Sequence, residues 1–195
     1  MTAMRTALGR FVLKVLAWLP LVFAVWWFGA PVLLFPVKLL LQGVAHAGFG
    51  DLFTGIEQSG AIITFATSLK PGEAGGTAAH LDVEVNGWLY SIGMPLFAAL
   101  VLAAREPGWP RTLAVGYAVL VPVVAWGMLA DVLKNIAITS GPLIASQTGF
   151  VAWQREVIAY AFQLGLLILP TVVPAVTWVL THRAFLERLR EKPEP

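Results

Sequence analysis

The stretch Thr112-Leu-Ala-Val-Gly-Tyr-Ala-Val-Leu-Val-Pro-Val-Val-Ala-Trp-Gly-Met-Leu-Ala-Asp-Val-Leu133 holds one charged residue, Asp131, among its 22 positions. A helix rising ~1.5 Å per residue needs about 20 residues to cross ~30 Å of hydrocarbon, so this stretch predicts a membrane-spanning helix. Comparable apolar stretches cover residues 11–35, 88–104 and 158–181. The sequence therefore predicts a single, mainly α domain built as a four-helix transmembrane bundle.

The composition agrees with a membrane protein. Of the 195 residues, 58% are hydrophobic and only 12% are charged, and the mean hydropathy is +0.77. These values exclude an ordinary soluble domain. The chain has no cysteine, which excludes a thiol nucleophile, a disulfide and a thiolate metal site.

The basic residues gather on one side of the predicted topology. They flank the first helix, connect the second helix to the third, and follow the fourth: Arg5, Arg10 and Lys14; Arg105 and Arg111; Arg183, Arg188, Arg190 and Lys192. Lys and Arg beside membrane helices are retained in the cytoplasm. We therefore expect a multi-pass membrane protein with both termini cytoplasmic. Since these anchors account for the pI of about 9.2, no nucleic-acid partner is implied.

The first apolar run is too long for one straight crossing. Its apolar character persists past Pro31 and Pro36 to about Ala47. A tilted or kinked helix would absorb the excess, and so would a helix followed by an interfacial segment. A cleaved signal peptide is disfavoured, because the apolar part of such a peptide spans only about 7–15 residues.

The longest polar insertion, residues 51–86, lies between the first and second helices and is expected outside the cytoplasm. Residues 61–69 favour a strand, residues 71–76 form a turn cluster, and residues 81–85 alternate apolar and acidic side chains. The sequence therefore predicts a small β-hairpin. Since an isolated hairpin is marginally stable, it must bury one face on its own helices or on a partner, and we expect that face to carry Leu81, Val83 and Val85.

The sequence lacks the residue patterns of the common catalytic centres. His46, His80 and His182 are scattered without metal-ligand spacing, and no serine stands in a Gly-x-Ser-x-Gly motif. Intramembrane aspartyl chemistry needs two carboxylates, whereas Asp131 is the only aspartate within a predicted membrane helix. We therefore predict no catalytic residue, no metal site and no cofactor.

One polar cluster remains as a candidate site near the outer membrane face. Asp131 and Lys134 stand three positions apart, and Arg155 and Glu156 introduce the fourth helix, with Gln163 further along it. Opposite charges on the two helices are expected to pair as Asp131–Arg155 and Lys134–Glu156, and Gln163 to form an interhelical hydrogen bond. Such a cluster serves either as a structural clamp between helices or as a contact for a partner.

Several segments resemble the exosortase H-associated membrane protein family. They are Arg10–Pro20, Val85–Pro95, Val124–Lys134, Trp153–Gly165 and Leu167–Pro170. Exosortase H is a transpeptidase-like bacterial membrane enzyme that processes C-terminal tripartite sorting signals with a Cys, an Arg and a His. The resemblance therefore implies an accessory role for this chain, which lacks the Cys. It also implies a location in the bacterial inner membrane, and it transfers no catalytic residue.

The leading hypothesis is a non-enzymatic accessory protein that binds the exosortase, its C-terminally sorted substrate, or both. Membrane lipid and a second copy of the chain are further expected partners. One alternative is a subunit of a transport complex that uses Asp131, Lys134 and Gln163 for a small molecule or proton. Another is an enzyme acting on lipid-linked substrates through the carboxylates of Glu57, Asp82, Glu84 or Glu156, although their spacing indicates no acid/base pair.

Overall fold

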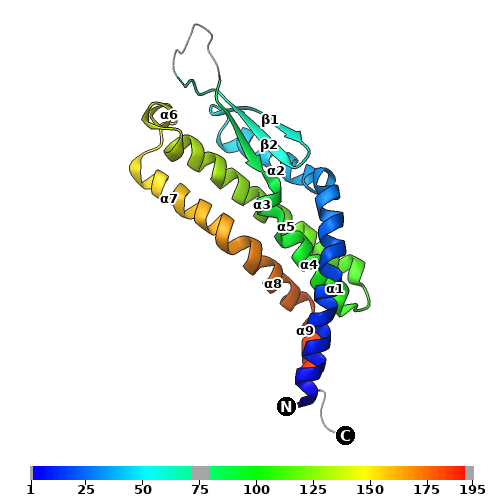
Figure 1. The fold of residues 1–195 in the computed structure, drawn as a ribbon. Coiled ribbons are helices and arrows are strands. Elements are labelled where there is room, and N and C mark those ends of the chain that lie inside the picture. Colours follow the sequence, from blue (N-terminus) through cyan, green and yellow to red (C-terminus); the bar gives the residue numbers. More distant parts are fainter. Residues whose placement is uncertain (1, 72–79, 192–195) are drawn as a thin grey trace.

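The computed structural model describes residues 2–71 and 80–191, and within them the side chains of residues 8–71 and 80–187. Four helical stretches are long and apolar enough to cross a membrane: Leu8–Leu33, Gly87–Ala104, Trp109–Thr139 and Ala152–Thr181. With a small antiparallel sheet between the first and second stretches, they confirm the predicted mainly α architecture (Figure 1). The sheet lies at one end of the molecule, and the start of the first helix and the last helix lie at the opposite end.

Figure 1 labels most of the helices and strands. The π-helical segment η1 extends α5, and η2 lies between α7 and α8. The bounds are α1 (Thr2–Leu33), α2 (Phe35–Gly48), β1 (Phe53–Ser59), β2 (Ile62–Thr67), β3 (Asp82–Asn86), α3 (Gly87–Ser91), α4 (Gly93–Ala104), α5 (Trp109–Lys134), η1 (Asn135–Thr139), α6 (Pro142–Gln147), α7 (Ala152–Gln163), η2 (Leu164–Ile168), α8 (Leu169–Thr181) and α9 (Arg183–Glu191).

The third and fourth spans are longer than predicted. The third continues through η1 beyond its expected end at Leu133, because no helix breaker occurs before Gly141–Pro142. The fourth begins at Ala152, ahead of its expected start. There the Gln154 side-chain oxygen accepts a hydrogen bond from the Val151 N–H at 3.0 Å, which satisfies a backbone donor that a helix start leaves free.

A bend at Leu34 accommodates the excess length of the first apolar run. α1 ends at Leu33, and α2 turns away from it under the sheet (Figure 1). Pro36 has no N–H, so the carbonyl four residues earlier loses its helical donor. The Tyr117 hydroxyl of α5 donates to the Leu33 carbonyl at 2.7 Å and ties the bend to the bundle. The first apolar run is therefore kinked, and α2 packs against α5 and β1.

The insertion is a three-stranded antiparallel sheet in the order β1-β2-β3. The predicted hairpin corresponds to β2 and β3, which pair with Ile63 opposite Val85. The prediction did not include β1. The register of β1 is irregular between Phe53 and Gly55, so Phe53 and Ile56 both face inward. Because of this spacing, β1 lacks the strict alternation of apolar and polar residues from which a strand is predicted.

The apolar face of the sheet packs on the helices of the same chain. Its buried side chains belong to one hydrophobic cluster with residues of α2 and α5: Phe53, Ile56, Ile63, Phe65, Val83 and Val85 with Val37, Leu41, Met128 and Val132. Of the two surfaces proposed for burial of the hairpin, the structure thus uses its own bundle. The opposite face of the sheet exposes Glu57, Asp82 and Glu84 to solvent, as the alternation in residues 81–85 predicts.

Glutamine side chains fix the sheet to the helices. Gln147 of α6 forms two hydrogen bonds with the backbone of Lys70. The Lys70 N–H donates to the Gln147 side-chain oxygen at 3.0 Å, and the Gln147 side-chain nitrogen donates to the Lys70 carbonyl at 2.8 Å. Gln42 of α2 donates to the Ile56 carbonyl of β1 at 3.1 Å. These contacts hold the sheet in a defined position above the membrane spans.

Glycines allow the closest helix crossings. A Cβ atom added at Gly165 of η2 would lie 2.8 Å from the Cα of Gly127 in α5. One added at Gly127 would lie 2.5 Å from the ring of Tyr90, and one at Gly93 would lie 2.5 Å from the Pro170 carbonyl oxygen. In lipid, where water does not drive helices together, such close backbone packing is a main source of association.

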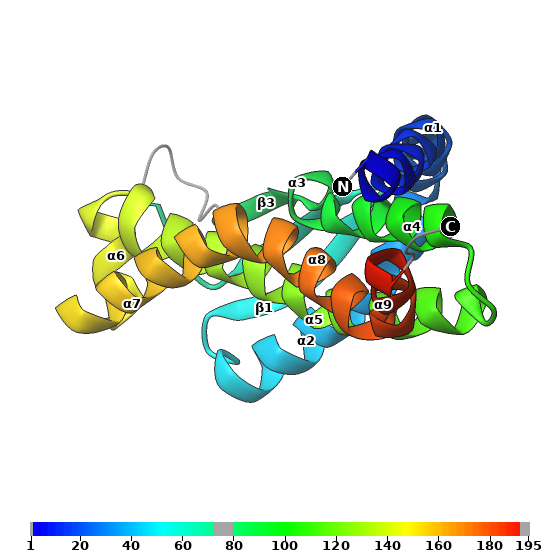
Figure 2. The same cartoon turned by 90° about the horizontal axis from the view of Figure 1, so that it is seen from below.

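An aromatic cluster closes the end of the bundle opposite the sheet. Viewed from this end, α1 stands at one side next to α4 (Figure 2). The ring of Trp178 stacks between Phe11 of α1 at 5.4 Å and His182 at 5.2 Å, and Phe185 of α9 packs on Phe11. Burial lowers the pKa of His182, and this effect outweighs the Trp178 carbonyl and the Glu106 charge, which favour the cation. The imidazole is therefore neutral at pH 7.

The close crossing of α5 and η2 predicts that a single methyl group added there destabilises the protein. Gly165→Ala should lower the free energy of unfolding by about 1–3 kcal/mol, because the new methyl group overlaps the Gly127 backbone. Gly43→Ala is the matched control, since a Cβ atom there meets nothing within 4 Å. Thermal unfolding of both purified variants in detergent measures the difference. A Gly165→Ala protein as stable as the control would contradict this packing.

Candidate functional site

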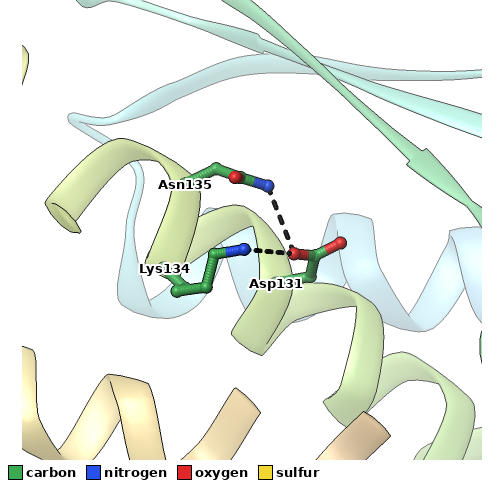
Figure 3. A network of polar contacts seen from close by, with 3 residues as sticks. All are labelled: Asp131, Lys134 and Asn135. Carbon is green, nitrogen blue, oxygen red and sulfur yellow. Dashed lines mark hydrogen bonds and ion pairs between the residues drawn. The ribbon is translucent and has the colours of Figure 1, made fainter. Parts of the chain in front are cut away.

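The predicted polar cluster begins at the end of α5 with an ion pair inside one helix. Lys134 Nζ lies 3.4 Å from Asp131 Oδ1, and Asn135 Nδ2 donates to the same oxygen at 3.2 Å (Figure 3). Both charged side chains are largely buried, with 17% of Asp131 and 23% of Lys134 exposed. Asn135 begins η1, so the pair stands where the helix changes from α to π geometry.

The expected pairs Asp131–Arg155 and Lys134–Glu156 do not form in the described part of the chain. Lys134 is the nearer partner of Asp131, because side chains three positions apart on a helix share a face. Contact with the fourth span comes instead from Lys134 Nζ, which lies 4.3 Å from the ring centroid of Phe162 in α7. A cation over an aromatic face is attracted by the ring. The ion pair and this contact together join α5 to α7.

Arg155 and Glu156 belong to a different environment from the Asp131–Lys134 pair. The Arg155 guanidinium donates from Nη2 to the Ala145 carbonyl of α6 at 3.2 Å. The Glu156 side chain is exposed and forms no ion pair with any described residue. Both line an open cavity of about 450 Å³ between η1, α6 and α7. The structure therefore divides the predicted cluster into a clamp on α5 and a second pair of charges at the start of α7.

Gln163 lies apart from both groups. Its side chain is exposed on the outer surface of the fourth span, at the junction of α7 and η2, and forms no hydrogen bond with the described residues. Its neighbours on this surface are apolar or aromatic, with Tyr160 70% and Leu167 66% exposed. The amide thus faces away from the bundle within a membrane-spanning segment. An interhelical hydrogen bond from Gln163 requires a helix outside this bundle.

An apolar groove that was not predicted from the sequence lies on another side of the bundle. It lies between α1, α4 and α5, has a volume of about 350 Å³, and is lined by residues that include Trp26, Phe97 and Tyr117. Trp26 is held there by a hydrogen bond from its Nε1 to Ser91 Oγ at 3.1 Å. No motif could have indicated the groove, because it depends on where three helices cross.

The polar groups show no arrangement typical of a metal site. Within residues 2–71 and 80–191, no three His, Asp or Glu side chains come together as metal ligands. The carboxylates considered for an enzyme are also dispersed. Glu57, Asp82 and Glu84 lie on the solvent face of the sheet, and Glu156 lies on α7.

Comparison with protein-family models assigns the chain to a family. The model described as exosortase H-associated membrane protein matches residues 5–185 of the 195. The chain belongs to this family. The match includes all four membrane spans and the sheet, and it confirms the resemblance noted in the sequence. Neither the curated proteins nor the solved structures provide a match. The family description associates this membrane protein with exosortase H.

The ion pair of α5 predicts a double-mutant effect. Asp131→Leu should destabilise the protein by about 1 kcal/mol or more, because it leaves the Lys134 ammonium without its counterion in a largely buried position. Asp131→Leu combined with Lys134→Leu should recover stability, because no unpaired charge remains. Unfolding of the two single variants and the double variant in detergent forms the complete cycle. Strictly additive effects would show that the two charges are not coupled.

Proposed function

We propose that this protein is a non-enzymatic accessory subunit that binds the exosortase, or the substrate it sorts, within the inner membrane. The observation that carries this proposal is the exposed amide of Gln163 in the fourth span. The family association with exosortase H supplies the class of partner. The proposed contact is a partner helix that lies along the outer surface of α7, η2 and α8.

The surroundings of Gln163 favour a helix as the partner. Polar amides in membrane helices form hydrogen bonds across helix interfaces, and an amide left in hydrocarbon lacks any partner. Around Gln163 the exposed side chains of Leu164, Leu167 and Ile168 provide an apolar surface for packing. The π geometry of η2 widens the helix at this position, as is frequent at functional sites.

The internal pairing of the other charges supports an accessory role over transport. The transport alternative requires Asp131, Lys134 and Gln163 along one path for an ion or small molecule. Asp131 and Lys134 neutralise each other, and Lys134 is further engaged by Phe162. Gln163 instead faces outward from the bundle. This separation suits a protein whose polar interior maintains its fold and whose outer surface recognises a partner.

The proposal requires that a change at Gln163 weaken recovery of the partner. Gln163→Leu should reduce the amount of exosortase that co-purifies from native membranes in mild detergent by about 3- to 20-fold, the effect of one interhelical hydrogen bond. Thr171→Val is the matched control. It removes a polar group from the same exposed surface, but the Thr171 hydroxyl already donates to the Ile168 carbonyl of its own helix at 3.0 Å.

One result would contradict this function, and a second would contradict the proposed contact. Recovery of the wild-type protein without an exosortase or a sorted substrate would contradict the accessory role itself. Equal recovery with Gln163→Leu and Thr171→Val would leave the association intact but remove Gln163 from the interface.

We further propose that the sheet faces the periplasm and that α9 faces the cytoplasm. In support, basic residues gather both near α9 and in the connection between α4 and α5. The positive-inside rule places such residues on the cytoplasmic side of the membrane. Because the chain has no cysteine, single-cysteine variants report accessibility without background. A membrane-impermeant maleimide should label Ser59→Cys in intact spheroplasts, and should label Glu187→Cys only after lysis. The reverse pattern would invert the topology.

A further inference from the structure

The cavity between η1, α6 and α7 combines two opposite charges with an apolar wall. It has a volume of about 450 Å³ and is open at the molecular surface. Its lining consists of Arg155 and Glu156 with small or apolar residues: Ala137, Ile138, Gly141, Pro142, Ala145 and Ala159. The cavity lies where the third span ends and the fourth begins. A ligand here would therefore sit at the membrane boundary, with one side toward water and the other toward hydrocarbon.

The charge of Arg155 forms no ion pair with an acidic side chain in the described part of the chain. Arg155 donates from Nη2 to the Ala145 carbonyl, but its buried Nε has no hydrogen-bond partner among those residues. Arginine presents five donors in a planar fork that matches phosphate and carboxylate oxygens. The guanidinium is thus anchored by one contact and retains donors for an anion.

Glu156 restricts the kind of anion that fits. Its exposed carboxylate lines the same cavity, so a simple anion bound at Arg155 would be repelled by it. A ligand with a phosphate and an ammonium group close together satisfies both side chains. The ethanolamine phosphate headgroup has this composition, and its ammonium carries N–H donors for a carboxylate. A choline headgroup lacks those donors, and a glycerol headgroup lacks the positive charge.

We propose that this cavity binds the headgroup of phosphatidylethanolamine, with the phosphate at Arg155 and the ammonium at Glu156. Ala137, Ile138 and Ala159 provide apolar surface for the glycerol and the first carbons of the acyl chains. The aromatic side chains of Trp153 and Tyr160 are 64% and 70% exposed on the same helix, α7. Such residues are enriched at the headgroup level of membranes. The site requires no exosortase and is independent of the function proposed above.

Native mass spectrometry of the purified protein tests this site with three added lipids of identical acyl chains: phosphatidylethanolamine, phosphatidylcholine and phosphatidylglycerol. The wild-type protein should retain the ethanolamine lipid in preference to the other two. Arg155→Gln should weaken its retention about tenfold or more, as expected for loss of a charged hydrogen bond. Glu156→Gln should abolish the preference for phosphatidylethanolamine over phosphatidylglycerol. Arg111→Gln is the control, since it removes an exposed arginine from the other end of α5.

Equal retention of the three lipids by the wild-type protein would overturn the proposal. An unchanged preference of Glu156→Gln for phosphatidylethanolamine over phosphatidylglycerol would also overturn it. The second result stays informative if Arg155→Gln fails to fold, because Glu156 is exposed and its substitution disturbs no hydrogen bond among the described residues. Ala159→Met fills the cavity from its apolar wall and should also reduce retention of phosphatidylethanolamine, while leaving both charges in place.

Discussion

The close approach of α5 to η2 at Gly127 and Gly165 is the constraint on which the rest of the bundle depends. A methyl group at either glycine would overlap a neighbouring backbone or ring. This proximity brings Tyr90 under α5 and places Lys134 above Phe162. Because lipid tails solvate apolar side chains as well as protein does, such dispersion contacts, rather than exclusion of water, position the helices. α5 is accordingly the helix against which the sheet, α2, α4, α7 and α8 pack, while α1 packs on α4.

A second constraint is that unpaired backbone carbonyls are costly near hydrocarbon. Beside the bend at Leu34, two carbonyls accept hydrogen bonds from side chains in distant parts of the chain. Tyr117 donates to the Leu33 carbonyl, and Gln58 of β1 donates to the Pro31 carbonyl at 2.9 Å. The same contacts tie α5 and the sheet to the bend. The sheet is therefore an integral support for the ends of the helices that lie beside it.

The polar groups of the spans fall into two classes with different consequences. Asp131 and Lys134 form an ion pair, and Lys134 also lies over an aromatic ring of α7, so both residues contribute to the fold. Gln163 and the pair Arg155 and Glu156 face outward with bonding capacity unused within the described chain. Polar groups with unused bonding capacity on the surface of a membrane protein are suited to contact with other molecules. This division supports a binding role, in keeping with a family named for its association with exosortase H.

The four spans, the pairing of β2 with β3 and the family can all be predicted from the amino-acid sequence. Each follows from local composition or short-range periodicity: an apolar run of about 20 residues leaves few alternatives, and the alternation of residues 81–85 specifies a strand face. The tertiary structure was needed to show that Arg155 and Glu156 stand apart from the Asp131–Lys134 pair, that β1 completes the sheet, and that Gln163 faces outward. These features depend on helix rotation and crossing, which contacts between distant glycines set, and no sequence spacing encodes those contacts. The Asp131–Lys134 pair is local to one helix, whereas the cavity of Arg155 and Glu156 exists only where η1, α6 and α7 meet.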